Sequence, residues 1–350
     1  MVRFTGGQKR PMGTARGRGR SGLALPVAVA GASLFGLTLA GIALADSAPG
    51  YELSFGSFGT SLGQFHSPKG IGIDPSGNVF VTQVDIPCRA QKFTKQGAVI
   101  LGFGGCGTGN GAFDFSWDCE VDGQGNVFVV DTRNDRVQKF SNMGTWMLNI
   151  GGYGSAEGKF NLPYGIAIDD GNSVYVTDRD NNRVQKFTTA GAFVKAWGSA
   201  GSGNGQFNKP LGIAADGSGN VYVGDAGNNR IQKFNSSGTY LDQLHNPGSG
   251  NGQLNVPGGL ACDRSGNLWV VDAGNYRIEK FTSNFTFLTK FGSVGSGNGQ
   301  FTGPWGIAVD GGGAVYVVDT SANKVVKFSS SGNTPVHPTT WGSLKERYTP

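Results

Sequence analysis

The stretch PLGIAADGSGNVYVGDAGNNRIQKFNSSGTYLDQL, residues 210–244, decides the fold because it contains four short apolar runs separated by turn signals. Residues 210–215, 221–225, 230–234 and 239–244 have the composition of strands. Gly and Asn between them supply the positive φ angles that tight turns need. The stretch therefore predicts four consecutive antiparallel strands.

The same unit is written six times. The Asp that closes its first strand recurs at steps of 48, 47, 47, 47 and 47 residues, at Asp74, Asp122, Asp169, Asp216, Asp263 and Asp310. Such regularity indicates an array of one supersecondary unit. Six four-stranded sheets packed around an axis bury both faces of each sheet and protect the edges. We therefore expect an all-β, six-bladed β-propeller, with a linear solenoid as the alternative.

The two ends of the array indicate how the ring closes. YELSF, residues 51–55, has the character of a fourth strand that arrives before the first complete unit. The last unit has a weak fourth strand of its own, because NTPVHPTTW (333–341) carries two prolines that hinder ladder pairing. We expect the N-terminal strand to complete the last sheet, in a propeller over 46–343 that is followed by a short tail, 344–350.

The N-terminal segment has the features of an export signal. A basic stretch precedes the apolar run LALPVAVAGASLFGLTLAGIALA, residues 23–45, which ends in small residues before Asp46. This pattern predicts a signal peptide over 1–45. The alternative is an uncleaved membrane anchor formed by 23–45. In both cases residues 46–350 function outside the cytoplasm, secreted or extracytoplasmic, and contact a membrane only through that segment.

The net charge of +5 does not indicate a nucleic-acid surface. Residues 1–45 hold six of the 29 Lys and Arg residues and no acid, which leaves 23 bases against 24 acids in 46–350. The basic character therefore belongs to the N-terminal segment, and overall charge gives no support for nucleic acid as a partner.

The repeats also resemble a known family. GSGNGQFNKPLGIAADGSGNVYVGDAGNNRIQKF (201–234) and the recurring motifs NDRVQKF, NNRVQKF, NNRIQKF and NYRIEKF are similar to the NHL repeat. The resemblance covers about 51–343. Proteins of this family serve as protein- or RNA-binding modules, as sensor domains outside bacterial membranes and, rarely, as enzymes. The resemblance therefore implies the fold but does not select one of these functions.

A recurring pair of charges favours structure over catalysis. An Asp ends the second strand of five units and a base begins the third strand five residues later, where the strand ends are neighbours. A catalytic pair would not recur in nearly every unit, so we expect structural hydrogen bonds. The pairs are Asp131 with Arg136, Asp178 with Arg183, Asp225 with Arg230, Asp272 with Arg277, and Asp319 with Lys324.

Function should lie where the copies differ. The residues after the first-strand Pro gather around the mouth of the central channel, and four of them form a partly aromatic collar: Lys69, Trp117, Tyr164 and Trp305. Aromatic side chains around a concavity suit ligand binding. The alternative is that they only fill the mouth.

The second copy reads SWDCEVD (116–122) and places Asp118 and Glu120 where the others have Gly and a small residue. Burial of two carboxylates without a partner would be costly. We expect a salt bridge to a neighbour such as Lys69 or Arg89, a divalent cation or ligand at the channel mouth, or a satisfied hydrogen-bond network. The ligand-binding candidates are therefore Lys69, Trp117, Asp118, Glu120, Tyr164 and Trp305.

Three of the four cysteines converge on the junction of the first two copies. A Cys88–Cys106 disulfide is the first choice, since both segments open on the same face, and Cys88–Cys119 is the second. The oxidising conditions that an exported chain meets favour a disulfide over the alternative of a thiolate metal site. Cys262 aligns with apolar residues and is expected to be a buried thiol.

These observations favour a non-enzymatic binding, scaffold or sensor module, acting as a monomer on a protein, peptide or glycan. The alternative is a metal-dependent lyase or a lactonase-like hydrolase. The resemblance to peptidyl-amidoglycolate lyases implies zinc-binding histidines after the first-strand Pro, but no copy has His there. RNA binding is the third hypothesis. No residue is assigned as catalytic.

Overall fold

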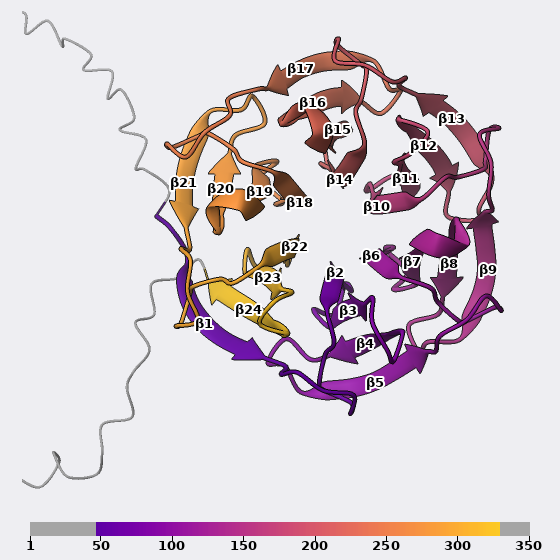
Figure 1. Ribbon diagram of the computed structural model, residues 1–350, viewed down its shortest axis with the longest axis vertical. Helices are drawn as coiled ribbons and strands as arrows, with labels where there is room; N and C mark the ends of the chain where they lie inside the picture. The colour runs from indigo at the N-terminus through magenta and orange to yellow at the C-terminus, as the bar shows by residue number, and fades with distance from the viewer. Residues whose placement is uncertain (1–46, 330–350) are drawn as a thin grey trace, which may run out of the picture. The chain divides into compact units, whose positions relative to one another are not determined.

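The computed structural model describes residues 47–329, which form six four-stranded antiparallel sheets arranged in a ring (Figure 1). Each sheet is one blade. The blades are numbered one to six in the chain order of their inner strands, which line the channel. The six inner strands begin at the Pro of each repeat, or at Ser116 in blade two. They are β2 (Pro68–Ile73), β6 (Ser116–Val121), β10 (Pro163–Ile168), β14 (Pro210–Ala215), β18 (Pro257–Cys262) and β22 (Pro304–Val309).

The second and third strands fill the middle of each blade. Val127–Asp131, for example, is buried at every residue because both of its faces pack against other strands. The second strands are β3 (Val79–Gln83), β7 (Val127–Asp131), β11 (Ser173–Asp178), β15 (Asn220–Asp225), β19 (Leu268–Asp272) and β23 (Val315–Asp319). The third strands are β4 (Arg89–Phe93), β8 (Arg136–Phe140), β12 (Arg183–Thr188), β16 (Arg230–Asn235), β20 (Arg277–Phe281) and β24 (Lys324–Ser329).

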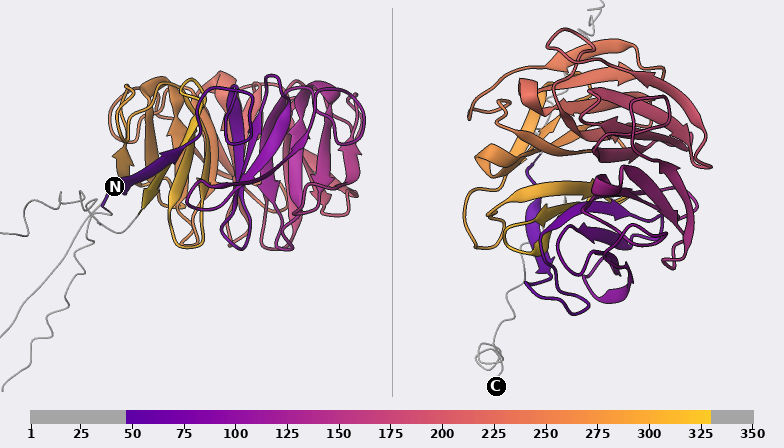
Figure 2. Two further views of the ribbon diagram at one scale, coloured as in Figure 1. Left: turned by 90° about the horizontal axis from the view of Figure 1, so that it is seen from below. Right: turned by 45° about the vertical axis from the view of Figure 1, so that its right-hand side comes forward.

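In the outer strands of blades one, two and six, exposed and packed residues alternate, and loops gather on two opposite faces of the ring (Figure 2). Short 3₁₀ turns follow three of the second strands: η1 (Thr132–Asn134), η2 (Ala226–Asn228) and η3 (Ala273–Asn275). The outer strands are β5 (Val99–Gly104), β9 (Trp146–Gly151), β13 (Phe193–Trp197), β17 (Tyr240–Leu244), β21 (Phe287–Phe291) and, in blade six, β1 (Gly50–Phe55).

The ring closes as the sequence predicts. β1 pairs antiparallel with β24, so the N-terminal strand completes the last blade, and the linear solenoid is wrong. Glu52 on β1 accepts a 2.7 Å hydrogen bond from Lys327 on β24. Blade six is also tied to blade one, where the Thr320 hydroxyl donates to the carbonyl oxygen of Pro68 at 2.7 Å.

Close approach of the inner strands explains the glycine at the third position of this strand. A Cβ at Gly165 would lie 2.3 Å from the carbonyl oxygen of Leu211 in the next blade, and one at Gly306 would lie 2.2 Å from that of Lys69. Both positions therefore need glycine to let adjacent inner strands meet. Asp118 is the copy-two residue at this position.

The recurring Asp and Arg are structural in four blades. Arg136 Nε donates to Asp131 at 2.8 Å, and the matching pairs in blades three, four and five measure 2.7, 2.8 and 2.8 Å. In blade six, Asp319 instead accepts hydrogen bonds from the backbone N–H groups of Thr302 and Gly303. These carboxylates hold the link between blades against the end of the second strand.

The predicted signal peptide or anchor (1–45) and the tail (344–350) lie outside the described residues, as does the predicted propeller boundary at 343. Within 47–329, no helix is long and apolar enough to cross a membrane.

Candidate functional site at the channel mouth

The structure brings the four collar residues together. The Trp117 ring lies 4.5 Å from the Tyr164 ring and 5.4 Å from the Trp305 ring, measured between centroids, and its plane is nearly perpendicular to that of Trp305. The Lys69 ammonium lies over both indoles, at 4.7 Å from Trp117 and 4.8 Å from Trp305. The collar is therefore one contiguous aromatic cluster with its own cation.

Local backbone geometry directs these side chains to the mouth. The residue before the first-strand Pro, or before Ser116, takes a left-handed conformation in blades one to five, as at Phe115 (φ 66°) and Lys209 (φ 54°). The pairing register between the first and second strands then shifts directly after the Pro or Ser, as between Pro210 and Ile213. The residue after the Pro or Ser is thus outside the regular ladder.

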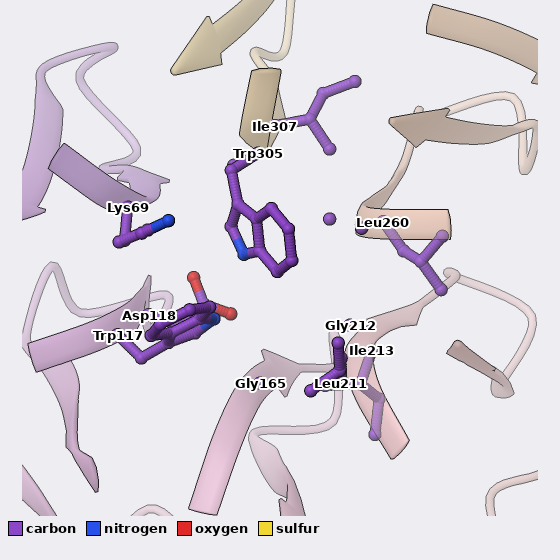
Figure 3. A pocket seen from close by; sticks show the side chains of 13 residues that line it. Lys69, Trp117, Asp118, Gly165, Leu211, Gly212, Ile213, Leu260, Trp305 and Ile307 are labelled. Carbon is purple, nitrogen blue, oxygen red and sulfur yellow. The ribbon is translucent and has the colours of Figure 1, made fainter. Parts of the chain in front are cut away.

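A small cavity of about 30 Å³ lies beneath the collar. Figure 3 shows the side chains of Lys69, Asp118 and Trp305 reaching into it from the inner strands of three blades. Much of the remaining wall is inner-strand backbone around Gly165, Gly212 and related positions. The cavity can hold little more than a water molecule, so a larger ligand would have to bind above it.

Asp118 connects two blades. Its carboxylate accepts hydrogen bonds from its neighbour Cys119 N at 2.9 Å and from Ile166 N, in blade three, at 3.2 Å. Burial raises the pKa of Asp118 to about 7, although both hydrogen bonds oppose the shift. A carboxyl group here thus takes the place of a glycine and bonds across the blade junction.

Glu120 accepts a hydrogen bond from Val121 N at 3.0 Å. Burial raises the pKa of Glu120 to about 8, and the charge of Asp118 adds to this shift. Among residues 47–329 there is no group of three or more His, Cys, Asp or Glu side chains that could hold a metal ion. A cation at Asp118 and Glu120 would have only this carboxyl pair as acidic ligands.

The predicted salt bridge to Lys69 or Arg89 is wrong. Lys69 places its ammonium over the two indoles, and burial lowers its pKa while Asp85 opposes the change. Arg89 instead donates hydrogen bonds to the carbonyl oxygens of Ser61 and Gln64, on the link that leads into blade one. Both cations therefore have other partners.

A second pocket lies beside the collar. It has a volume of about 300 Å³, and Trp117, Tyr164 and Trp305 form its aromatic wall. Arg179 and Lys209 add two cations that sequence reasoning missed. The available signal was departure from the repeat, since each is the only charged residue at its position among the six copies.

A polar groove continues from this pocket between blades three and four. It has a volume of about 640 Å³ and shares Lys209 with the collar pocket. Asn side chains dominate its lining together with Asp180: Asn161, Asn182, Asn208 and Asn228. Sequence reasoning assigned no role to these residues, because Asn is also the ordinary turn residue of the repeat.

The opposite mouth of the channel is wider, and two of its acids are paired with lysines. A cavity of about 690 Å³ is lined by the carboxylates of the turns between first and second strands. Asp74 and Asp122 are paired with Lys92 and Lys139, each at 3.2 Å. Cys262 lines this cavity as a half-buried thiol, so the expectation of full burial is wrong; its strand end opens onto the mouth.

The disulfide follows the first-choice pairing. Cys88, in the loop after β3, is bonded to Cys106, in the link after β5. Cys119 is a free, buried thiol, so the second-choice pairing is wrong. Its sulfur lies 3.7 Å from the carbonyl oxygen of Phe80, in the hydrophobic core between blades one and two.

The NHL repeat pattern matches residues 160–187, 207–234 and 301–328, each from a link Phe to the Phe that ends the third-strand motif. This chain belongs to the NHL repeat family. None of the curated protein sequences is significantly similar to it.

Solved structures similar to this NHL propeller share its fold at low sequence identity. A Bacteroides thetaiotaomicron protein of unknown function has a TM-score of 0.62 at 17% identity, covering 79% of this chain and 76% of its own. A Xanthomonas campestris gluconolactonase has a TM-score of 0.57 at 14% identity, covering 80% and 96%. Virginiamycin B lyase from Staphylococcus aureus has a TM-score of 0.54 at 17% identity, covering 76% and 85%. Identities this low carry no function across.

Proposed function

We propose that this NHL propeller is an exported, monomeric and non-enzymatic binding module, whose ligand is a protein, peptide or glycan held at the collar face. The observation that carries the proposal is the contiguous cluster of Trp117, Tyr164 and Trp305 beside a 300 Å³ pocket. That volume falls within the roughly 300–1,000 Å³ typical of ligand sites. Exposed aromatic side chains around a concavity carry much of the energy in binding sites.

The polar groups beneath the collar support binding over catalysis. Three carboxylate oxygens of Asp118 and Glu120 already accept backbone hydrogen bonds. His66, the histidine on this side of blade one, bonds the carbonyl oxygen of Ile86 and lies 3.8 Å from Asp85. These groups are engaged in local structure and leave no nucleophile and base facing each other at the collar.

Binding arrays of peptides and glycans, probed with the purified protein, test the proposal. We expect retention of one ligand class, lost by at least tenfold in Trp305→Ala. Tyr153→Ala is the matched control, because Tyr153 is 76% exposed on the link between blades two and three, outside the collar pocket. Equal loss in both variants, or retention unchanged in Trp305→Ala, would overturn the proposal.

A metal-dependent lyase or lactonase-like hydrolase is the second candidate. The half-buried carboxyl pair Asp118 and Glu120 in the channel favours it, since raised pKa values are frequent at catalytic sites. Elemental analysis of the purified protein decides between the two. One divalent ion per chain, lost in Asp118→Asn and kept in Trp305→Ala, would favour the enzyme.

A further inference from the structure

We propose that the collar face binds an acidic oligosaccharide, with one uronate ring in the collar pocket and the following sugars in the Asn-lined groove. This inference rests on the proposed binding function and narrows its ligand to one class. Three adjoining features carry it: an aromatic wall, cations beside that wall, and a groove of side-chain amides that begins at Lys209.

The aromatic wall suits the flat, apolar face of a sugar ring. Trp117 and Tyr164 lie 4.5 Å apart between ring centroids, and Trp305 stands nearly perpendicular to Trp117 at 5.4 Å. The two indoles are held by Lys69, whose ammonium lies over both. The wall is thus preorganised, which lowers the entropy cost of ligand binding.

The cations select an acidic ring. Arg179 lies 5.0 Å over the Tyr164 ring, and Asp180 accepts a 2.6 Å hydrogen bond from it, so one acid partly neutralises this guanidinium. Lys209 is exposed, and its ammonium has no ion-pair partner among residues 47–329. A ligand carboxylate beside Tyr164 would supply the missing partner in a charge-assisted hydrogen bond.

The amides suit hydroxyl groups. An amide side chain both donates and accepts, as a sugar hydroxyl does. Asn208 lies against the turn after β15, since a Cβ added at Gly227 would come within 2.5 Å of its Cγ. Asn182 is partly engaged, because its side-chain oxygen accepts the backbone N–H of Lys209 at 2.9 Å. The side-chain amides of Asn161 and Asn208 have no hydrogen-bond partner among the described residues and line the groove.

Charge and shape favour this ligand over RNA or a peptide. Residues 46–350 carry 23 bases against 24 acids, which gives no net positive field for the long run of phosphates in RNA, whereas Arg179 and Lys209 at the collar pocket suffice for the carboxylate of one uronate ring. A peptide strand needs an open sheet edge for main-chain pairing, whereas the inner strands pack closely against those of the adjacent blades, as at Gly165 and Gly306. Hydroxyl-rich chains need neither feature.

Isothermal titration of the full chain with tetragalacturonate and, separately, with neutral tetragalactose tests the inference. We expect binding of the acidic tetramer only. Lys209→Gln should weaken this binding about tenfold and Lys209→Arg should retain it, as a single charge-assisted contact is worth roughly 1.4 kcal/mol. Asn208→Ala should weaken the tetramer severalfold but leave galacturonate monomer unchanged, because only the tetramer reaches the groove.

Lys95→Gln, at the opposite mouth, is the matched charge control and should bind as the unchanged protein does. Equal affinity for the two tetramers, or tetragalacturonate affinity unchanged in Lys209→Gln, would overturn the inference. Failure of both tetramers to bind would also overturn it. The binding proposal would survive if an array ligand still depended on Trp305.

Discussion

Asp118 and Glu120 are two carboxyl groups in a position where five other blades have Gly and a small residue. The backbone N–H groups of Cys119 and Val121 donate hydrogen bonds to these carboxylates and offset part of the free-energy cost of removing them from water. The remaining cost of burial raises the pKa of Asp118 to about 7 and that of Glu120 to about 8. In the folded protein these groups favour their neutral forms.

Stability should therefore depend on pH through this pair. The folded pKa values of about 7 for Asp118 and about 8 for Glu120 exceed the roughly 4 of an unfolded carboxyl. The folded state holds extra protons between these limits, so the stabilisation is complete below pH about 4 and is lost as pH rises through about 7 and about 8. We expect urea unfolding free energy to fall between pH 5 and pH 9.

The double variant Asp118→Asn with Glu120→Gln is the control for this pH dependence. Amides keep the shapes and do not titrate, so the decline should flatten. A decline of equal slope in the double variant would show that other groups carry the pH dependence.

Glu279 offers a second residue-scale prediction. Blades one to four have Gln at this place, and the Gln138 amide accepts from Gly111 N at 2.9 Å and donates to the carbonyl oxygen of Ala112 at 2.6 Å. Glu279 is buried, and neither of its carboxylate oxygens accepts a hydrogen bond. Its Oε1 lies 2.9 Å from Arg277 Nη2, an ion pair without hydrogen-bond geometry. Burial raises its pKa to about 7. Glu279→Gln should stabilise the protein by about 1 kcal/mol.

The gain should be larger at pH 8 than at pH 5, because the carboxylate is charged only above about 7 in the folded protein. Urea unfolding at both pH values measures it. The reverse change, Gln232→Glu in blade four, should destabilise and serves as the matched control. A destabilised Glu279→Gln variant would contradict the interpretation.

At the scale of single elements, the loop after β3 departs most from the repeat. Its residues VDIPC contain one more residue than the equivalent loops, and the Cys88–Cys106 disulfide joins this loop to the link that follows β5. The two segments open on the collar face, where Asp85 from the same loop acts on Lys69. The disulfide thus restrains an element that borders the candidate site.

Reduction of this disulfide should destabilise the protein by about 3 kcal/mol. The two cysteines are 18 residues apart, and closing a loop of this length restricts the unfolded chain by about that amount. Thermal unfolding with and without reductant, together with Cys88→Ser, measures the loss. Reductant should leave the stability of Cys88→Ser unchanged, and a further drop there would contradict this account.

For the whole ring, closure depends on one short strand. β1 brings Phe55 against Phe93 of blade one, with ring centroids 5.0 Å apart, while its backbone pairs with β24. The strand therefore connects the first and last blades through both its side chains and its backbone. An open ring would expose the edge of β24 and the apolar faces beside it.

Phe55→Ala should lower the unfolding free energy by about 3–5 kcal/mol, the usual cost of deleting a buried Phe side chain. Urea denaturation followed by tryptophan fluorescence measures the loss. Val194→Ala on β13 is the outer-strand control, since Val194 is 50% exposed, and it should cost little. A Phe55→Ala loss no greater than the control would contradict a closing role for β1.

Much of the architecture was predictable because it repeats. The 47-residue spacing and the Asp and Arg pairs depend on contacts that each blade makes with itself or with a similar neighbour. The first-choice disulfide was also predictable, since both segments lie on one face of adjacent repeats. The salt bridge of Asp118 or Glu120 with Lys69 or Arg89 was not, because a long side chain has several partners within reach.

The sequence by itself determined six equivalent sheets, their closure by the N-terminal strand and the identity of the collar residues, because periodic patterns and turn residues act locally. Only the tertiary structure decided that Lys69 lies over Trp117 and Trp305, and that Arg179 and Lys209 border the aromatic wall. Those contacts join residues from different blades. Their distances depend on the curvature of the closed ring, which no single repeat encodes.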